Sequence, residues 1–204
     1  DNSIDEILSR SARNIQLYLS KNNIVTIKDD GRGIPIDKHP KFKNKSALEI
    51  VLTTLHAGGK FNEKIYNTSG GLHGVGLSVV NALSENLEVK VFKNGTVYSQ
   101  KYKKGKAKEK IKKKKCTKKL KGTEISFQPD KSIFNNNLFD PIKIYNLLKT
   151  KAYLVKGASI YWSCDKILTD KISIPKKEHF CFLNGIKDYI DIIRKNRKKL
   201  FEQI

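Results

Sequence analysis

A glycine-rich stretch in the first half of the chain has the composition of an anion-binding turn. Gly70, Gly71, Gly74 and Gly76 stand directly before apolar residues with helical spacing. Glycines at the start of a helix leave backbone N–H groups free and let an anion approach the positive end of the helix dipole. Lys60 lies upstream and adds a mobile cation. The pattern predicts a phosphate-binding loop, and the alternative is a plain tight turn before the helix.

A second polar cluster follows an alternating apolar segment. Val25, Ile27 and Asp29 share one face of a predicted strand, so the Asp29 carboxylate points toward the core. A buried carboxylate needs polar partners. Gly31 and Gly33 follow at once and allow a flat ring to approach the backbone. The cluster predicts a site in which Asp29 accepts a hydrogen bond from the exocyclic amine of adenine; the alternative is a strand-to-loop turn with a capping Asp.

Two further residues fit the same ligand. Thr123 shares the apolar face of a later strand with Ile125, and its hydroxyl can donate to a ring nitrogen directly or through a water. Asn2 lies beside Asp5 and Glu6 at the start of a helical pattern. An amide oxygen is a suitable ligand for Mg²⁺, which takes one or two protein oxygens besides phosphates. The alternative is that these residues only cap the helix and interact with its dipole.

Hydrophobic spacing predicts the elements that must hold these residues. We expect helices over 1–10, 47–58, 74–83, 141–155 and 186–193, and strands over 15–19, 25–29, 87–91, from 97 onward, and over 123–127, 159–163 and 179–183. The apolar residues that predict the third helix are Val75, Val79, Val80 and Leu83. This order predicts an α+β fold, a two-layer sandwich in which helices cover one face of a mostly antiparallel mixed sheet. The length predicts one domain over 1–204.

The excess of positive charge is concentrated in one segment. The chain has 41 Lys and Arg against 20 Asp and Glu, a net charge of +21, and the segment Lys101–Lys121 holds 13 Lys and one Glu. A lysine run without a regular apolar period is typical of a solvated, mobile insertion. The alternative interpretation is a DNA-contacting arm.

Composition also argues against several classes of protein. No stretch of 18 uncharged apolar residues is present, and the opening acidic residues do not resemble a signal peptide, so we expect no membrane partner. The cysteines Cys116, Cys164 and Cys181 stand far apart. They suggest neither a disulfide framework nor a zinc site, and they favour a reducing compartment.

Taken together, these motifs resemble the ATPase domain of bacterial-type DNA gyrase B subunits, within the GHKL superfamily and the type IIA topoisomerases. The resemblance covers residues 1–130 closely and the remainder more loosely. The matching runs occur in the order of the family: DNSIDE (1–6), DDGRGIP (29–35), LHAGGKF (55–61), SGGLHGVG (69–76), SVVNALS (78–84) and GTEISF (122–127). GGKF and GGLHGVG resemble the bacterial type IIA enzymes more than the wider superfamily.

The resemblance implies ATP and Mg²⁺ as cofactors. Asn2 would hold the metal, and Asp29 would bind the adenine amine with support from Thr123. The other implied binding positions surround the adenine or belong to the lid over the phosphates: Glu6, Arg32, Gly33, Ile34, Pro35, Lys60, Tyr66, Gly71, Leu72, His73, Gly74, Val75 and Gly76. Lys93 stands where the family usually has an Arg that contacts coumarin inhibitors, and the lysine-rich segment 101–121 departs from the family.

The general base of the family is a Glu four residues before the position of Asn2, which lies upstream of Asp1. We therefore expect this chain to bind nucleotide and to hydrolyse it slowly. Residues 184–204 would lead toward a transducer domain.

The implied function is ATP-dependent DNA supercoiling, driven by dimerisation of two ATPase domains and carried out with the A subunit of DNA gyrase and with DNA. The alternatives are a topoisomerase IV homologue and a non-catalytic nucleotide- or DNA-binding module. The composition favours a plastid-like organelle, an apicoplast, over a bacterial-type cytoplasm or nucleoid.

Overall fold

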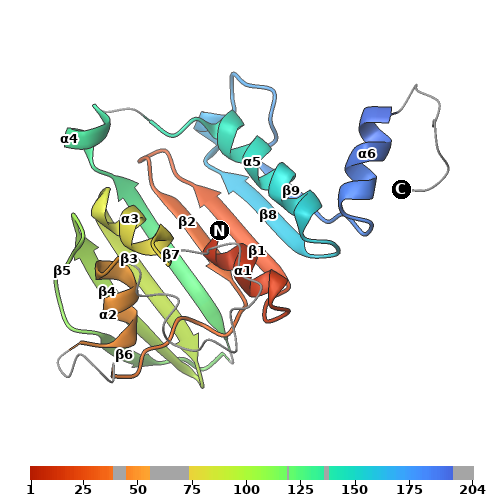
Figure 1. Cartoon of the computed structure of the whole chain (residues 1–204). Helices are drawn as coiled ribbons and strands as arrows, with labels where there is room; N and C mark the ends of the chain where they lie inside the picture. Colours follow the sequence, from red (N-terminus) through yellow and green to blue (C-terminus); the bar gives the residue numbers. More distant parts are fainter. Residues whose placement is uncertain (39–44, 56–73, 119, 136–137, 195–204) are drawn as a thin grey trace.

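The fold is built on one mixed β-sheet with helices against one face (Figure 1). The computed structural model describes residues 1–38, 45–55, 74–118, 120–135 and 138–194. In this part the strands are β1 (Asn14–Leu19), β2 (Val25–Asp29), β3 (Ser84–Lys93), β4 (Thr96–Lys103), β5 (Lys106–Ala107), β6 (Lys112–Lys115), β7 (Gly122–Pro129), β8 (Ser159–Cys164) and β9 (Lys177–Phe180). The helices are α1 (Asn2–Leu8), α2 (Ala47–Thr53), α3 (Gly76–Ala82), α4 (Lys131–Phe134), α5 (Pro141–Leu154) and α6 (Ile186–Arg194), with a 3₁₀ turn at Lys166–Leu168.

The strands follow the order β5-β4-β3-β7-β2-β1-β8-β9, and β6 also pairs with β4. Neighbouring strands are antiparallel except β1 and β8, which run parallel with Ile15 opposite Ile160. Helices α1, α2, α3 and α5 lie over the same face of the sheet (Figure 1). This arrangement confirms the α+β prediction of a mostly antiparallel, mixed sheet with helices on one side.

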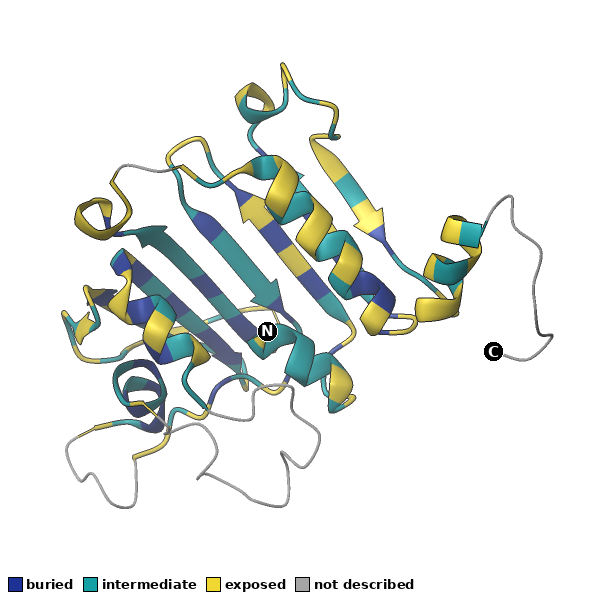
Figure 2. Cartoon of the chain, turned by 45° about the horizontal axis from the view of Figure 1, so that its top comes forward, coloured by how far each residue is buried: buried dark blue, intermediate teal, exposed yellow. Residues whose placement is uncertain are grey.

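Alternation along the strands decides which side chains are buried. In β1, Ile15, Leu17 and Leu19 are buried, whereas Gln16 and Tyr18 are exposed. Successive strand residues point to opposite faces, so the apolar side chains collect under the helices and the polar ones on the open face. Figure 2 shows the buried residues recurring along the strands, while much of α5 and α6 is exposed.

The buried side chains form two clusters. One lies under α5 and includes Leu19, Ile160 and Trp162, which are at most 1% exposed. The other lies under α2 and α3 and includes Leu52 and Val89, which are fully buried. Strands β2 and β7 run between these two clusters, because Ile27 and Phe127 pack against the first and Ile125 belongs to the second. The segment that ends in Asp29 is therefore supported from both sides.

Helices α2 and α3 differ from their predictions. Helix α2 ends at Thr53, before the predicted glycine boundary, and Leu55 is exposed. Helix α3 buries Ser78 and Asn81. Of its predicted apolar residues, Val80 packs against the cluster under α2 and α3, whereas Val79 and Leu83 are 40% and 37% exposed. Asn81 is buried because its Nδ2 donates to the carbonyl oxygen of Leu52 at 2.8 Å, which ties α3 to α2. The Oδ1 of Asn81 is buried without a hydrogen-bond partner among the described residues, so only the donor half of this amide is compensated.

The lysine-rich segment also differs from its prediction. Instead of a mobile insertion, it contributes Lys101–Lys103 to β4 and forms β5 and β6, both hydrogen-bonded to β4. Ile111 supplies an apolar anchor that packs against the cluster under α2 and α3. The backbone hydrogen bonds of an open sheet edge therefore order residues that composition alone suggests are disordered. The predicted solvation is confirmed, since every described Lys of this segment is exposed.

The C-terminal part follows its predictions with one shift. Helices α5 and α6 lie where the sequence placed them, but β9 covers Lys177–Phe180 and not 179–183. Phe182 leaves the sheet because its ring stacks on Tyr153 of α5, with ring centroids 3.7 Å apart. In the described part of the chain, no helix combines the length and the apolar character that a bilayer-spanning helix needs.

Candidate functional site

Asp29 closes strand β2 and is the most deeply buried acidic side chain that the sequence singled out, with 2% exposure. Its Oδ1 accepts hydrogen bonds from the backbone N–H of Gly31 at 3.0 Å and of Thr123 at 3.2 Å. Its Oδ2 accepts from the Ser3 hydroxyl at 2.8 Å. Each carboxylate oxygen has two lone pairs, so Oδ1 is fully used and Oδ2 can accept one more donor.

Burial raises the pKa of the Asp29 carboxyl above its ordinary value, because desolvation disfavours the charged form. The hydrogen bonds from Ser3, Gly31 and Thr123 act in the opposite direction, and the nearby charge of Glu6 adds to the rise. A donor from a ligand to Oδ2 would favour the ionised form. The site is therefore arranged so that ligand binding and the charge of Asp29 are coupled.

Thr123 lies beside Asp29, at the start of β7. Its backbone N–H bonds the Asp29 carboxylate, and its hydroxyl oxygen accepts from the N–H of Ile34 at 3.2 Å. Because that oxygen acts as the acceptor in this bond, its own proton is available to a further acceptor. The structure thus brings together the two inward-facing polar groups that the sequence predicted, one from β2 and one from β7.

Three glycines allow tight packing around this pair. A Cβ on Gly31 would lie 2.6 Å from the Glu6 carboxylate, and a Cβ on Gly33 would lie 2.9 Å from Val91. Gly33 also has a φ of +78°, a conformation that favours glycine. Gly122 has a φ of +113°, and a Cβ there would lie 2.0 Å from the carbonyl oxygen of Asp29. These positions require glycine because neighbouring atoms lie too close to admit a Cβ, and not only because the chain turns there.

Glu6 and Arg32 form the outer rim. Arg32 Nη2 lies 2.8 Å from Glu6 Oε1, Arg32 Nε lies 3.2 Å from Oε2, and the Arg32 backbone N–H donates to Oε2 at 2.9 Å. This two-pronged contact fastens α1 to the loop after β2. Ile34 is buried and Pro35 is exposed on the same loop. All four are predicted site residues. Arg32 reaches the site through Glu6, Ile34 reaches it through its hydrogen bond to Thr123, and Pro35 follows Ile34 along the loop.

Asn2 is the first residue of α1 and lies next to Ser3, which contacts Asp29. Helix α1 packs on β1 and β2, so Asn2 lies near the Asp29 end of the sheet (Figure 1). Its half-buried amide has no hydrogen bond to the described residues, and an amide oxygen is chemically suited to Mg²⁺. No group of three or more His, Cys, Asp or Glu able to hold a metal occurs among the described residues. A single protein oxygen with phosphate and water ligands fits the preferences of that ion.

Part of the predicted phosphate loop can be placed. Gly74 has a φ of +59°, Val75 precedes α3 as its N-cap, and Gly76 is the first residue of the helix. Among the described residues, nothing lies within 4 Å of a Cβ added to Gly76. The remaining predicted lid residues lie outside the described residues: Lys60, Tyr66, Gly71, Leu72 and His73.

Two residues of the site were missed from the sequence. Ser3 was not predicted to be a site residue. The available signal was its hydroxyl, which lies next to Asn2 on a helix that covers the sheet. Gly122 was placed before the predicted strand 123–127 and given no role in the site. Its position directly before Thr123 was the signal for a close backbone approach. Both act on Asp29, Ser3 through a hydrogen bond and Gly122 through backbone contact.

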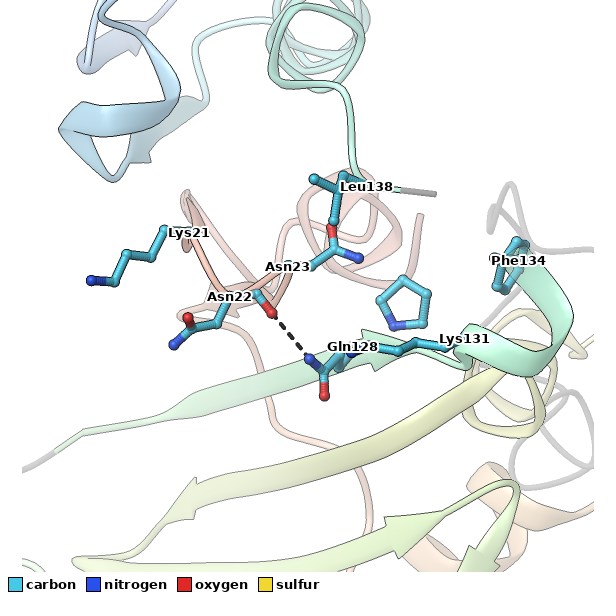
Figure 3. Close-up of a pocket in the computed structure, with 8 residues that line it drawn as sticks. Lys21, Asn22, Asn23, Gln128, Lys131, Phe134 and Leu138 are labelled. Atoms are coloured by element: carbon cyan, nitrogen blue, oxygen red, sulfur yellow. Dashed lines mark hydrogen bonds between the residues drawn. The ribbon is translucent and has the colours of Figure 1, made fainter. Parts of the chain in front are cut away.

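A separate hollow, of about 490 Å³, lies at the turn between β1 and β2 (Figure 3). Gln128 Nε2 donates to the Asn22 carbonyl oxygen at 3.0 Å across it, and Asn23 Oδ1 accepts from the N–H of Phe139 at 2.7 Å. These polar atoms are used to tie the turn to the end of β7 and to the segment before α5. None of the residues predicted to bind nucleotide lines this hollow.

Comparison with known proteins finds relatives among the B subunits of type II DNA topoisomerases. A related protein is the B subunit of DNA topoisomerase 4 from Rickettsia conorii, 51% identical over 93% of this chain and 28% of its own length. The B subunit of DNA gyrase from Thermotoga maritima is 43% identical over all of this chain and 31% of its own length. This chain thus spans less than a third of these relatives.

A solved structure has a similar fold over the whole chain. The crystal structure of the 43K ATPase domain of Thermus thermophilus gyrase B in complex with an aminocoumarin matches with a TM-score of 0.81 and 32% identity, covering 100% of this chain and 49% of that one. Residues 1–133, which contain Asn2, Asp29 and Thr123, match the family described as histidine kinase-, DNA gyrase B-, and HSP90-like ATPase. The chain therefore belongs to the family of histidine kinase-, DNA gyrase B- and HSP90-like ATPases.

Proposed function

We propose that this chain is the ATP-binding module of the B subunit of a type IIA DNA topoisomerase. The observation that carries the proposal is the environment of Asp29. Its carboxylate is nearly buried, it keeps one acceptor position free on Oδ2, and the Thr123 hydroxyl beside it has a proton to donate. An acceptor next to a donor matches the amine and the adjacent ring nitrogen of adenine.

The rest of the site fits a nucleotide with its metal. Gly31 and Gly33 keep the loop after β2 in close contact with Glu6 and Val91, and the turn at Gly74–Gly76 leads directly into α3. Asn2 would hold Mg²⁺ through its amide oxygen, and the metal would offset phosphate charge when bound. The roles of the predicted site residues rest on the family resemblance together with this geometry.

In the whole protein we propose that nucleotide binding drives dimerisation of two such modules and the passage of DNA, together with an A subunit. The topoisomerase 4 and gyrase relatives both support this scheme. The topoisomerase 4 relative from Rickettsia bellii, at 50% identity, supports the topoisomerase IV alternative, and the gyrase relative from Thermotoga maritima, at 43%, supports the gyrase assignment. The two are distinguished by assembling the full B subunit with each candidate A subunit. Supercoiling that depends on ATP identifies gyrase, and decatenation without supercoiling identifies topoisomerase IV.

Calorimetric titration with a non-hydrolysable ATP analogue and Mg²⁺ tests nucleotide binding. We expect Asp29→Asn to weaken binding by about 10- to 100-fold, because an amide can place a donor against the adenine amine and leave both buried groups unsatisfied. Asp30→Asn is the matched control. Asp30 uses its carboxylate for Arg13 and Asn14, with the Asn14 amide 2.7 Å from Oδ2.

The control variant should keep the affinity of the wild type. Equal affinity for nucleotide in the wild type and in Asp29→Asn would refute the assignment of the adenine site. The expectation of slow hydrolysis by this 204-residue chain remains a prediction, which a steady-state phosphate-release assay on the same protein would test.

A further inference from the structure

Strand β6 is made of four consecutive lysines, Lys112–Lys115, and all four are exposed. It pairs with Thr96–Ser99 of β4, while β5 pairs with the other end of β4, so the two short strands together form one edge of the sheet. Further exposed lysines lie between β5 and β6, at Lys108 and Lys110. We call this surface, residues 106–115, the lysine edge.

Few acidic groups neutralise the lysine edge. Within the described residues, Lys112 is paired with Glu109, and no other Lys of residues 106–115 has a carboxylate within 4.0 Å. Lys113 lies over the ring of Tyr98, with its Nζ 5.7 Å from the ring centroid. The surface therefore carries a dense positive charge that the fold itself does not offset.

Protection of the sheet edge explains only part of this charge. Edge strands commonly carry a lysine to prevent pairing with another chain, and one charge is enough for that purpose. Alternate lysines on a strand are about 7 Å apart, within the Debye length of about 8 Å at physiological salt, so they repel one another. Four in succession destabilise the edge unless an anionic partner supplies counter-charge.

We propose that the lysine edge binds the phosphate backbone of duplex DNA without reading sequence. Lysine is a flexible point charge suited to phosphate, and the edge presents a row of them. Single-stranded nucleic acid is less suitable, because it needs exposed aromatic side chains for stacking. Tyr102 is 1% exposed, and Tyr98 packs against the cluster under α2 and α3 and lies under Lys113. The choice of DNA over other polyanions rests on the proposed function.

The apolar side chains of the segment point to the same partner. Ile111 and Ala107 pack against the cluster under α2 and α3, so the edge offers no apolar group for insertion into a membrane. A membrane-surface site combines basic residues with an apolar face. A rigid charged rod fits this surface better than a lipid layer.

The experiment measures binding of a fluorescent duplex of about 30 base pairs by anisotropy, at salt concentrations from about 50 to 200 mM. The test variant changes Lys112, Lys113, Lys114 and Lys115 to Gln. A duplex along the edge meets at least two of them, so the slope of log K against log salt should become shallower by about 2, and affinity should fall by at least about 50-fold at 0.1 M salt. A variant with Arg at the same four positions should retain binding.

The matched control also removes four positive charges, but near the opposite edge of the sheet. It changes the exposed Lys166, Lys171, Lys176 and Lys177 to Gln. It should lose less than about 3-fold. An equal loss in the control would overturn the proposal, because net charge would then explain binding. Unchanged DNA binding in the β6 variant would also overturn the proposal. If that variant self-associates but still binds DNA, the four lysines serve only to protect the sheet edge.

Two parallel measurements complete the test. Binding to phosphatidylserine vesicles should be weak in the wild type, and a variant that loses vesicle binding but keeps DNA binding would contradict the proposal. Titration of the ATP analogue on the same proteins should give equal affinities in the wild type and both lysine variants. Failure of all three proteins to bind nucleotide would refute the proposed function while leaving the DNA result to decide the lysine edge.

Discussion

At the scale of single residues, the central feature is a carboxylate whose environment opposes its own charge. Asp29 is desolvated, and its compensation comes from Ser3, Gly31 and Thr123, three separate parts of the chain. A group held in this way is expensive to keep for structure alone, because an apolar residue of similar size would avoid the desolvation. The position of the Asp29 carboxylate next to the Thr123 hydroxyl, whose proton is available, is consistent with ligand recognition.

Asp29 gives the first prediction, on pH. Its folded-state pKa lies above the reference value of 3.8, so the folded protein holds this proton more tightly than the unfolded chain. The contribution of Asp29 to the free energy of unfolding therefore decreases as pH rises from about 4 through the raised pKa. We expect the stability of Asp29→Asn relative to the wild type to increase over this window. Urea unfolding of both proteins at several pH values checks it, and a constant difference would contradict it.

The second prediction compares two glycines with positive φ. Gly122 has a φ of +113° and backbone 2.0 Å from an added Cβ, whereas Gly157 has a φ of +71° and nothing within 4 Å. Gly157→Ala should cost about 1–2 kcal/mol from strain alone. Gly122→Ala should cost more than about 3 kcal/mol, because the backbone of Asp29 cannot move away. Thermal unfolding measures both, and similar losses would show that the strand pairing tolerates displacement.

At the scale of elements, the pairing of β2 with β7 builds the site. Their antiparallel register places Lys28 opposite Glu124, so Thr123 falls beside the last residue of β2. Helix α1 then closes the site from above through Ser3 and Glu6. The short helix α4 continues β7 beyond its other end, and its N-cap Asp130 fixes how the chain leaves the sheet.

Asp130 gives the third prediction. A hydrogen-bonded Lys104, with its Nζ 3.0 Å from Oδ2, lowers the pKa of Asp130 to about 2, and bonds from Ser132 contribute further. Because the folded pKa is depressed, the stabilisation is present above the reference value of 3.8 and is lost as pH falls toward about 2. Asp130→Asn keeps a good helix cap but loses the charge, so its melting temperature should be lower at pH 7 and less sensitive to acid below pH about 4.

The matched control for Asp130 is Asp140→Asn at the N-cap of α5. Asp140 accepts from the N–H groups of Ile142 and Lys143, and no lysine or arginine of the described residues lies within salt-bridge distance of it. Loss of its charge should therefore change the melting temperature less. An equal decrease in both variants would mean that the cap, and not the ion pair with Lys104, carries the effect.

At the scale of the whole molecule, the parallel pairing of β1 with β8 joins the two halves of the chain. Strand β8 comes well after the family match at residues 1–133, yet it covers the other edge of β1 from Asn14 to Leu19. Trp162 and Ile160 on β8 are buried in the cluster that supports β1. The first half of the chain thus depends on residues beyond the family match.

The fourth prediction follows from this dependence. A protein ending at residue 133 loses α5, β8 and β9 and exposes the cluster that contains Leu19 and Val25. Burial of apolar surface is the main favourable term in folding, so we expect this shortened protein to lack a cooperative thermal transition. Circular dichroism during heating measures it. A transition within a few degrees of that of the 204-residue chain would show that the C-terminal half is dispensable.

The sequence alone determined which residues have binding chemistry and which face each occupies. Alternation put Asp29 and Thr123 on the inner face of their strands, and the spacing of apolar residues predicted α1, α5 and α6. The single-domain boundary, the cellular compartment and the roles of the lid residues remain predictions.

Only the tertiary structure decided which strands are neighbours. Period-two alternation fixes the face of a residue but not the partner across the sheet, and the hydrogen bond between Asp29 and Thr123 joins residues 94 positions apart. Because these contacts also join distant parts of the chain, the sequence did not predict the bond from Ser3 to Asp29 or the burial of Asn81. It also did not predict that an open sheet edge orders the lysines of β6. Local composition describes a segment, whereas backbone hydrogen bonds to distant strands determine whether it is part of the fold.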